Sequence, residues 1–278
     1  GFAKAEKLRS EFVIGVTGSV KKRGGAVNEN LTTGEMEVVV EDIRILSESE
    51  TPPFPIEENS KTKDEVRLKY RYLDLRRPDL QRNIMMRSQV ATLTRSFLAD
   101  EGFFEIETPI LNRSTPEGAR DYLVPSRVHP GNFYALPQSP QLFKQLLMVG
   151  GTDRYFQIAK CFRDEDLRAD RQPEFTQIDL EMSFVDVDDV LEIQEGFLKR
   201  LFKELMDTDI ETPLRRIPYD EAMERYGSDK PDTRFGFELV DLSKNEAIKN
   251  TEFKVFADVL ANGGDIRGIC IDGGSEKF

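Results

Sequence analysis

Tryptophan is absent from this 278-residue sequence, histidine occurs once and cysteine twice. His129, Cys161 and Cys270 are too few for a disulfide framework or a zinc site, and they exclude a metal centre built on histidine. Such sparse cysteine favours a reducing, cytoplasmic environment. No run of 18 apolar residues occurs, so we expect no membrane span. The first residues also lack the apolar segment that a signal peptide needs.

Positive charge is in short supply. Lysine and arginine number 39 against 51 aspartates and glutamates, which gives a formal net charge of −12. This balance argues against a protein that binds nucleic acid over its whole surface, although an enzyme can still meet RNA through a local basic patch. A hydrophobic content of 38% with 32% charged residues is typical of a soluble globular protein, and the length allows two domains.

Three prolines between positions 52 and 55 are the clearest boundary signal. Such a stretch cannot be helical and favours a stiff connector, so we place a domain boundary there. Before it, β-rich runs at Phe12–Val16 and Met36–Val40 with glycine turns predict about three strands. Basic turns in this segment allow nucleic-acid binding, but a small β appendage is the plainer interpretation.

Arginine and tyrosine mix along Val66–Leu80, VRLKYRYLDLRRPDL. Basic and aromatic side chains together can bind RNA through charge and stacking. The alternative, which we favour, is packing combined with surface charge.

An amphipathic helix is predicted over Gln81–Glu101. Gly102 follows it, where a left-handed residue is expected after a helix, and a short strand over Phe103–Thr108 ends at Pro109. The apolar residues that repeat at helical spacing are Met86, Val90, Leu93 and Phe97.

Alternation of apolar and polar residues within Arg154–Phe184 predicts two strands on either side of a charged loop. If the strands pair, their polar sides form one floor. That much ordered polarity suits a site for a small, highly charged ligand. Charge alone also fits a solvated hairpin tip laced with ion pairs. The residues that share the polar parity are Gln157, Arg163, Glu165, Gln177, Asp179 and Glu181.

Ser139 and Pro140 are typical of a helix start, as the N-cap and the first helical residue. Gln141 and Lys144, three residues apart, share one face of this helix. Taken alone, Lys144 is typical of an ordinary surface lysine. The residues expected to face inward are Leu142, Leu146 and Val149.

The segment Ser114–Tyr122 is rich in turn-forming residues and carries Glu117. By itself it is typical of an exposed turn. A loop of this size with an acid near its tip can also close over a ligand.

Several of these segments resemble one known family. Phe162–Glu165, with Arg154 upstream and a polar strand downstream, resembles motif 2 of the class II aminoacyl-tRNA synthetases. The wider string FRDEDLRADRQPEFTQID is similar to that of the bacterial-type aspartyl-tRNA synthetases. The long helix, Gly102, the short strand and Pro109 resemble motif 1, which builds the homodimer interface in that family.

The resemblance implies an α+β fold, with an antiparallel sheet and flanking helices as the catalytic core. After residue 234, β-rich runs at Phe253–Phe256 and Ile266–Ile271 predict two strands. The implied segments are a partial OB-fold anticodon-binding domain (1–50), a linker or hinge (51–80), the class II catalytic core (81–234) and the start of the bacterial-type insertion domain (235–278).

The implied activity is aspartate–tRNA ligation in a homodimer that contacts its partner around Pro109. ATP and aspartate would form aspartyl-adenylate, and the aspartyl group would pass to tRNA. Arg163 would be catalytic. The implied aspartate-binding residues are Glu117, Ser139, Gln141, Lys144, Arg163, Gln177 and Asp179. The ATP-binding residues would be Arg163, Asp164, Glu165 and Gln172, and Arg168 and Arg171 would meet the tRNA acceptor end.

The sequence departs from the family in what it omits. The glycine-rich third motif and the acidic Mg²⁺ ligands of the family are expected beyond residue 278, so no metal ligand is assigned here. Two alternatives stay open. One is a non-catalytic module that binds tRNA or an amino acid. The other is an enzyme for asparagine or lysine, although Lys144 would repel a lysyl substrate. Selectivity among tRNAs is also open.

Overall fold

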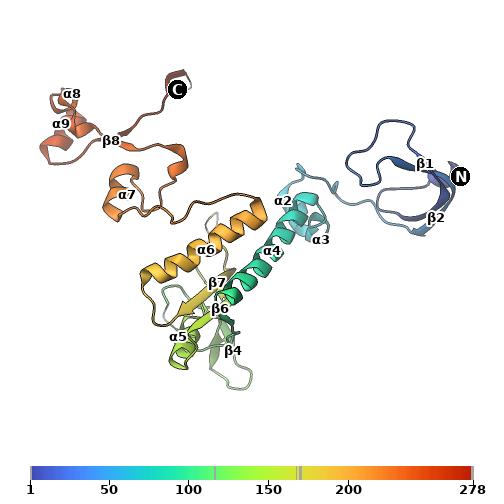
Figure 1. The fold of residues 1–278 in the computed structure, drawn as a ribbon, viewed down its shortest axis with the longest axis horizontal. Helices are drawn as coiled ribbons and strands as arrows, with labels where there is room; N and C mark the ends of the chain where they lie inside the picture. The colour runs from blue at the N-terminus through green and yellow to red at the C-terminus, as the bar shows by residue number, and fades with distance from the viewer. Residues whose placement is uncertain (1, 116, 167, 169–170, 277–278) are drawn as a thin grey trace. The chain divides into compact units, whose positions relative to one another are not determined.

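The structure is a computed structural model that describes residues 2–115, 117–166, 168 and 171–276 (Figure 1). The chain divides into two compact units. The first is Gly1–Val185 with Glu204–Asp207, and the second is Asp186–Lys203 with Thr208–Phe278. Each unit is described by itself below. Helices and antiparallel sheets are mixed throughout the described chain, and the predicted α+β class is confirmed.

A long two-stranded ribbon opens the first unit. After the short helix α1 (Phe2–Ala5), strand β1 (Val13–Lys22) pairs antiparallel with β2 (Met36–Ser47). The expectation of about three strands is wrong for this segment, because each predicted β-rich run extends into one long strand of a single hairpin. Ile43 is the buried apolar residue of the ribbon, and most of its valines are exposed.

A buried ion cluster organises the segment after the prolines. The carboxylate of Asp74, at the end of helix α3 (Arg71–Asp74), is fully buried and accepts hydrogen bonds from three arginines. They are Arg67 of helix α2 (Asp64–Lys69), Arg71 of α3, and Arg77, which follows α3. Burial by itself would raise the pKa of Asp74, but hydrogen bonds from Arg67 and Arg77 outweigh it and hold that pKa below its usual value. The arginine-rich string thus serves packing here, which agrees with the interpretation favoured from the sequence.

The long helix α4 (Pro78–Asp100) starts three residues before the predicted boundary, with Pro78 in its first turn. It ends as expected, because Gly102 adopts a φ of +80°. Leu93 and Phe97 are buried, but Met86 from the same predicted stripe is exposed.

The sheet that carries the polar floor has the order β3–β6–β7. Strand β3 (Phe104–Glu105) runs parallel to β6 (Arg154–Phe162), and β6 pairs antiparallel with β7 (Glu174–Met182). The register sets Gln157 opposite Asp179, so the polar sides of both strands share one face as predicted. Tyr155 and Phe156 are buried in this sheet and anchor it.

A small sheet and one helix complete the first unit. Strand β4 (Leu123–Pro125), which the sequence did not reveal, pairs with β5 (Phe133–Ala135), and α5 (Gln141–Val149) follows. The helix begins one residue later than predicted, with Pro140 at the N-cap, and the Ser139 hydroxyl accepts only a long 3.4 Å hydrogen bond from the Gln141 amide.

The inward face of α5 was predicted wrongly. The expected stripe of Leu142, Leu146 and Val149 is exposed, and Lys144 is the buried residue of the helix. The polar partner of Lys144 on β7 draws that face of the helix onto the sheet.

The second unit contains most of α6 (Val187–Met206), together with α7 (Tyr219–Tyr226), α8 (Glu246–Lys249) and a two-stranded sheet of β8 (Leu239–Asp241) and β9 (Arg267–Ile269). The strand expected near Ile266–Ile271 is present in shorter form. The one expected at Phe253–Phe256 is wrong, because this segment opens helix α9 (Lys254–Ala261). Phe256, Val259 and Leu260 recur at helical spacing, which a four-residue window conceals.

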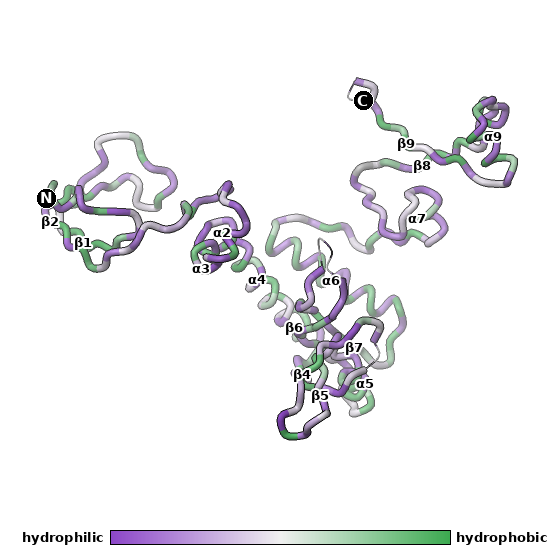
Figure 2. The backbone as a smooth tube through the Cα atoms, turned by 180° about the vertical axis from the view of Figure 1, so that it is seen from behind, coloured by the Kyte–Doolittle hydropathy of each residue, from purple (hydrophilic) through white to green (hydrophobic). Residues whose placement is uncertain are grey.

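Hydropathy varies over short distances along the chain (Figure 2). Within the described residues, none of the helices is both long enough and apolar enough to cross a membrane.

Candidate functional site

The floor of the candidate site is the polar face of β6 and β7. The side-chain carbonyl oxygen of Gln157 accepts hydrogen bonds from the hydroxyls of Tyr155, at 2.9 Å, and Thr108, at 3.0 Å. Cys161 donates its thiol proton to the carbonyl oxygen of Gln177 at 3.2 Å. Both floor amides are therefore fixed by neighbours, so the floor is ordered before any ligand arrives.

A buried ion pair stands on this floor. Lys144 Nζ lies 2.8 Å from Asp179 Oδ1 and 3.3 Å from Glu181 Oε2. Lys144 is only 8% exposed and Asp179 only 9% exposed. Helix α5 delivers the lysine and strand β7 delivers both acids, so the pair forms only when the helix packs on the sheet.

The second carboxylate oxygen of Asp179 is buried and accepts no hydrogen bond of normal geometry from the described residues. The Tyr155 hydroxyl lies near Asp179 and lowers its pKa, but it donates its proton to Gln157. Burial raises the pKa of Asp179 above its usual value, although the bond from Lys144 works in the opposite direction. A buried acceptor left in this state carries a desolvation cost that a bound donor can remove. Asp179 is therefore suited to receive a cationic group of a ligand.

Glu117 stands at the rim, in the loop before β4. The Ser139 hydroxyl donates to Glu117 Oε2 at 2.8 Å. Gly118, the next residue, adopts a φ of +103°, which an L-residue rarely tolerates. Glu117 and Ser139 both line a cavity of about 160 Å³ whose wall includes Leu142 and Phe143.

Gln138 ties this loop to the segment before α5, and sequence reasoning missed it. Its side chain is 2% exposed. The amide accepts from Ala119 N at 3.0 Å and donates to Ala119 O at 2.9 Å and to Asp121 Oδ1. Its place directly before Ser139 is the only sequence signal that points to it.

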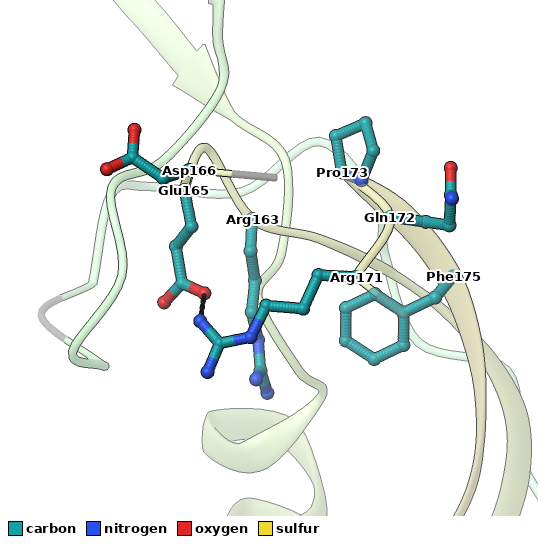
Figure 3. Close-up of a pocket in the computed structure, with 7 residues that line it drawn as sticks. All are labelled: Arg163, Glu165, Asp166, Arg171, Gln172, Pro173 and Phe175. Atoms are coloured by element: carbon teal, nitrogen blue, oxygen red, sulfur yellow. Dashed lines mark hydrogen bonds and ion pairs between the residues drawn. The ribbon is translucent and has the colours of Figure 1, made fainter. Parts of the chain in front are cut away.

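A larger hollow of about 390 Å³ lies where the β6–β7 hairpin opens (Figure 3). The Arg163 guanidinium stacks 5.1 Å from the Phe175 ring centroid and makes no ion pair within the described part of the chain. Glu165 and Arg171 point toward each other and pair at 3.2 Å. The lining residues are Arg163, Glu165, Asp166, Arg171, Gln172, Pro173 and Phe175.

Of the remaining predicted residues, Gln172 lines the larger hollow, whereas Gln141, Asp164 and Arg168 line neither hollow. Gln141 is half-buried as the first residue of α5, and Gln172 is exposed at the larger hollow. Asp164 donates its backbone N–H to Arg120 O at 3.0 Å, which ties the hairpin to the Glu117 loop. Arg168 is exposed. Its neighbours Leu167, Ala169 and Asp170, which belong to the string that carries the resemblance, lie outside the described residues.

Pro109 is exposed after β3, and its carbonyl accepts from the Asn112 side chain at 3.1 Å. Three large apolar side chains near it are also exposed: Phe104, Ile110 and Leu111.

Neither metal nor thiol chemistry is favoured by the described residues. They contain no group of three or more histidine, cysteine, aspartate or glutamate side chains placed to hold a metal ion. Burial raises the pKa of the Cys161 thiol to about 11, which keeps it protonated. The described side chains around these hollows contact one another through ion pairs and hydrogen bonds.

Comparison with protein families gives a match that covers most of the chain. The sequence profile described as tRNA synthetases class II (D, K and N) matches residues 63–258.

Curated relatives match nearly the whole chain. An aspartate–tRNA(Asp/Asn) ligase of Lachnoclostridium phytofermentans is 70% identical over 99% of this chain and 46% of its own length. An aspartate–tRNA ligase of Agathobacter rectalis is 67% identical over 98% of this chain and 45% of its own length. The chain therefore spans about half the length of the curated relatives that it matches.

Two solved structures share the fold. Asparaginyl-tRNA synthetase from Pyrococcus horikoshii, complexed with asparaginyl-adenylate, matches with a TM-score of 0.67 and 26% identity over 87% of this chain and 56% of its own. A putative aspartyl-tRNA synthetase from Leishmania major matches with a TM-score of 0.63 and 26% identity over 72% of this chain and 40% of its own.

Proposed function

The chain belongs to the class II tRNA synthetases (D, K and N), and from that premise we propose that it forms part of an aspartate–tRNA ligase. Its site joins L-aspartate to ATP as aspartyl-adenylate and passes the aspartyl group to the 3′ end of tRNA. The names of the 67–70% identical relatives support aspartate over the other two amino acids of the family.

The observation that carries this proposal is the Lys144–Asp179 pair with one acceptor left open. L-Aspartate has one ammonium group and two carboxylates. Lys144 binds the side-chain carboxylate, while Asp179 Oδ2 and Glu117 receive the ammonium. An amino acid with a cationic side chain would be repelled by Lys144. The side chains of Ser139, Gln141 and Gln177 complete the pocket.

The hollow beside Arg163 takes the nucleotide. An arginine without an ion pair in the described residues, held by an aromatic ring, is suited to bidentate contact with a phosphate. Arg163 binds the α-phosphate of ATP and the α-carboxylate of aspartate. Glu165 and Gln172, which line the hollow, surround the rest of the nucleotide together with Asp164, the residue between Arg163 and Glu165. Arg168 and Arg171 lie on the hairpin tip, where they meet the acceptor end of tRNA.

The first step is an in-line displacement. An oxygen of the aspartate α-carboxylate attacks the α-phosphorus of ATP, and the bond to pyrophosphate breaks. A hydroxyl of the terminal ribose of tRNA then attacks the aspartyl carbonyl, and AMP leaves. Neither step needs a covalent enzyme intermediate. Arg163 lowers the barrier by holding both reactants and by neutralising charge that builds at phosphorus.

Mg²⁺ is the metal that the family implies. Magnesium prefers carboxylate oxygens with several waters. Two acids line the larger hollow, Glu165 and Asp166, and Glu165 is already paired with Arg171. The described residues thus do not fit a complete magnesium site, and no step above passes through the ion.

A homodimer and a cytoplasmic location complete the proposal. The exposed apolar residues around Pro109 suit contact with a second copy of the protein. Two free cysteines, Cys161 and Cys270, suit a reducing compartment.

The test is ATP–pyrophosphate exchange by the complete gene product, with aspartate, asparagine or lysine as the amino acid. Exchange that depends on aspartate and is at least about a hundredfold weaker with the other two, as expected when a buried charge is left unpaired, supports the proposal. No exchange with any of the three would favour the alternative, a non-catalytic module that binds tRNA or an amino acid.

A further inference from the structure

We propose that Gln138 is a positioning residue that sets the affinity for the amino acid by clamping the loop that carries Glu117. This inference rests on the proposed function, since it assigns Glu117 to the ammonium group of the substrate. Gln138 bonds to the backbone of the loop and is not one of the residues proposed to contact the substrate.

The Gln138 side-chain amide bonds to the loop in the way that a backbone amide would. The Gln138 amide donates to and accepts from one residue, Ala119, at 2.9 and 3.0 Å. Neighbouring strands exchange the same pair of bonds in an antiparallel sheet. The second amide proton reaches Asp121 Oδ1, and Ser114 donates its hydroxyl proton to the other oxygen of Asp121. Both donors of the Gln138 side chain are therefore used.

Burial gives the clamp its strength. Gln138 is 2% exposed, so water cannot replace bonds that are lost. A buried polar group left without a partner costs far more than a typical exposed hydrogen bond is worth. The loop segment after Gly118 is also fixed from two further sides. Leu136 N donates to Tyr122 O, and Asp164 N donates to Arg120 O.

Glu117 lies on the other side of Gly118 from this fixed segment. Its contacts among the described residues come from the hydroxyls of Ser139 and Thr115. Gln138 and Ser139 are adjacent, so one short segment holds the loop on both sides of the glycine. Loss of these hydrogen bonds shifts the backbone next to Glu117 and therefore the position of its carboxylate. The residues that line the Arg163 hollow do not belong to this loop, so that hollow is unchanged.

The test is a comparison of Michaelis constants in the complete gene product. Gln138→Met keeps the length of the side chain and removes every hydrogen bond. We expect the KM for aspartate to rise roughly ten- to hundredfold, and the KM for ATP to stay within about twofold. The matched control is Gln145→Met on the exposed side of α5, which should change neither constant.

A second substitution that restores the lost affinity can distinguish a positioning role of Gln138 from a role in packing alone. Gln138→Glu keeps one acceptor but sets a carboxylate against Ala119 O and the Asp121 carboxylate, so it should raise the KM for aspartate at least as much as Gln138→Met. Asp121→Asn alone keeps its acceptor toward Gln138 and should be nearly silent. When the two changes are combined, the new amide at position 121 can donate to the new carboxylate at position 138, and we expect part of the lost affinity to return.

Amide hydrogen exchange measures the hydrogen bond between Gln138 and Ala119 directly and does not depend on enzyme activity. The Ala119 amide should be protected in the unaltered protein and should exchange faster in Gln138→Met. Equal protection in both proteins would overturn the proposal, and so would an unchanged KM for aspartate or a parallel rise of both constants with a fall in Tm. If the unaltered protein shows no aspartate-dependent exchange of pyrophosphate, the proposed function fails, and amide exchange still decides whether Gln138 holds the loop.

Discussion

The Lys144 ammonium lies 2.8 Å from Asp179 Oδ1, and both side chains are about nine-tenths buried. Two charges removed from water in this way cost free energy that their mutual attraction repays only with good geometry. Glu181 adds a second acid at 3.3 Å, so two carboxylates share one lysine. The arrangement leaves Asp179 Oδ2 without a partner among the described residues. This open acceptor does not stabilise the fold, but it can bind an ammonium group.

The first prediction concerns loss of the lysine. Lys144→Met leaves the buried Asp179 without its cation, and we expect the free energy of unfolding to fall by about 3–5 kcal/mol. Aspartate-dependent exchange should be lost. Lys144→Met combined with Asp179→Asn should recover most of the stability and none of the activity. The measurements are thermal unfolding and pyrophosphate exchange.

The control for this change is Lys160→Met, because Lys160 pairs with Glu174 at the surface and both side chains are half-exposed. Exposed pairs contribute about 0–1 kcal/mol. Equal losses of stability in Lys144→Met and Lys160→Met would contradict the buried pair.

A second prediction concerns pH. Burial raises the pKa of Asp179, so the folded protein takes up this proton at a pH where the unfolded chain does not. The contribution of Asp179 to the free energy of unfolding is therefore largest below its unfolded value near 3.8 and falls as the pH rises through the raised pKa. Binding has the opposite sign, because the ammonium group needs the charged carboxylate. We expect kcat/KM for aspartate to fall as the pH is lowered through the raised pKa of Asp179.

The pH profile is checked with Asp179→Asn, whose kcat/KM should be low and should lose that acid limb. If the limb persists unchanged in Asp179→Asn, another group causes it.

The third prediction concerns Arg163. Arg163→Ala removes the guanidinium that is stacked on Phe175, and adenylate formation should fall by at least about a hundred- to a thousandfold. The fold should persist, because Arg163 makes no ion pair within the described residues. Arg127→Ala, in the exposed turn between β4 and β5, is the matched control. Wild-type exchange rates in Arg163→Ala would rule out its assigned role.

Arg168 offers a change of a different kind, because it is exposed in the loop between β6 and β7 and lines neither of the two hollows. Arg168→Ala should leave pyrophosphate exchange within about twofold and raise the KM for tRNA in aminoacylation. One lost phosphate contact should also lower the salt dependence of tRNA binding by about one ion. A drop in exchange itself would move Arg168 into the ATP site.

The sequence predicts the residues on β6 and β7 that form the floor of the site better than it predicts the residues that α5 contributes. Period-two alternation decides which residues of β6 and β7 share a face, so Gln157 and Asp179 are assigned to polar faces from the sequence, and the register that sets them opposite each other comes from the structure. The burial of Lys144 is not predictable in this way. Its charge argues for the surface, and the apolar stripe beginning at Leu142 argues for the opposite helix face. Lys144 is buried because it pairs with Asp179 on β7, which is far away in sequence.

Two other differences have separate causes, one a distant contact and the other a short sequence window. Gln138 is marked in the sequence only by its place before Ser139, because its partner is the backbone of Ala119, which carries no side-chain signal. Helix α9 was mistaken for a strand because four apolar-rich residues fit either period. Long strands and helices were predicted from their own patterns, whereas contacts made by one side chain with distant backbone were not.

The last prediction concerns Gly118, which lies between Glu117 and the segment held by Gln138. A Cβ at this position would meet no atom within 4 Å, so crowding is not the obstacle to a side chain. The obstacle is the φ of +103°, which should cost an L-residue about 1–2 kcal/mol. Gly118→Ala should therefore raise the KM for aspartate roughly five- to thirtyfold, because the loop turns elsewhere and Glu117 leaves its position. Gly24→Ala is the matched control, since Gly24 also has open space around it but no positive φ. If both variants keep the wild-type KM, the backbone turn at Gly118 does not set the position of Glu117, and the ammonium group is held by Asp179 alone.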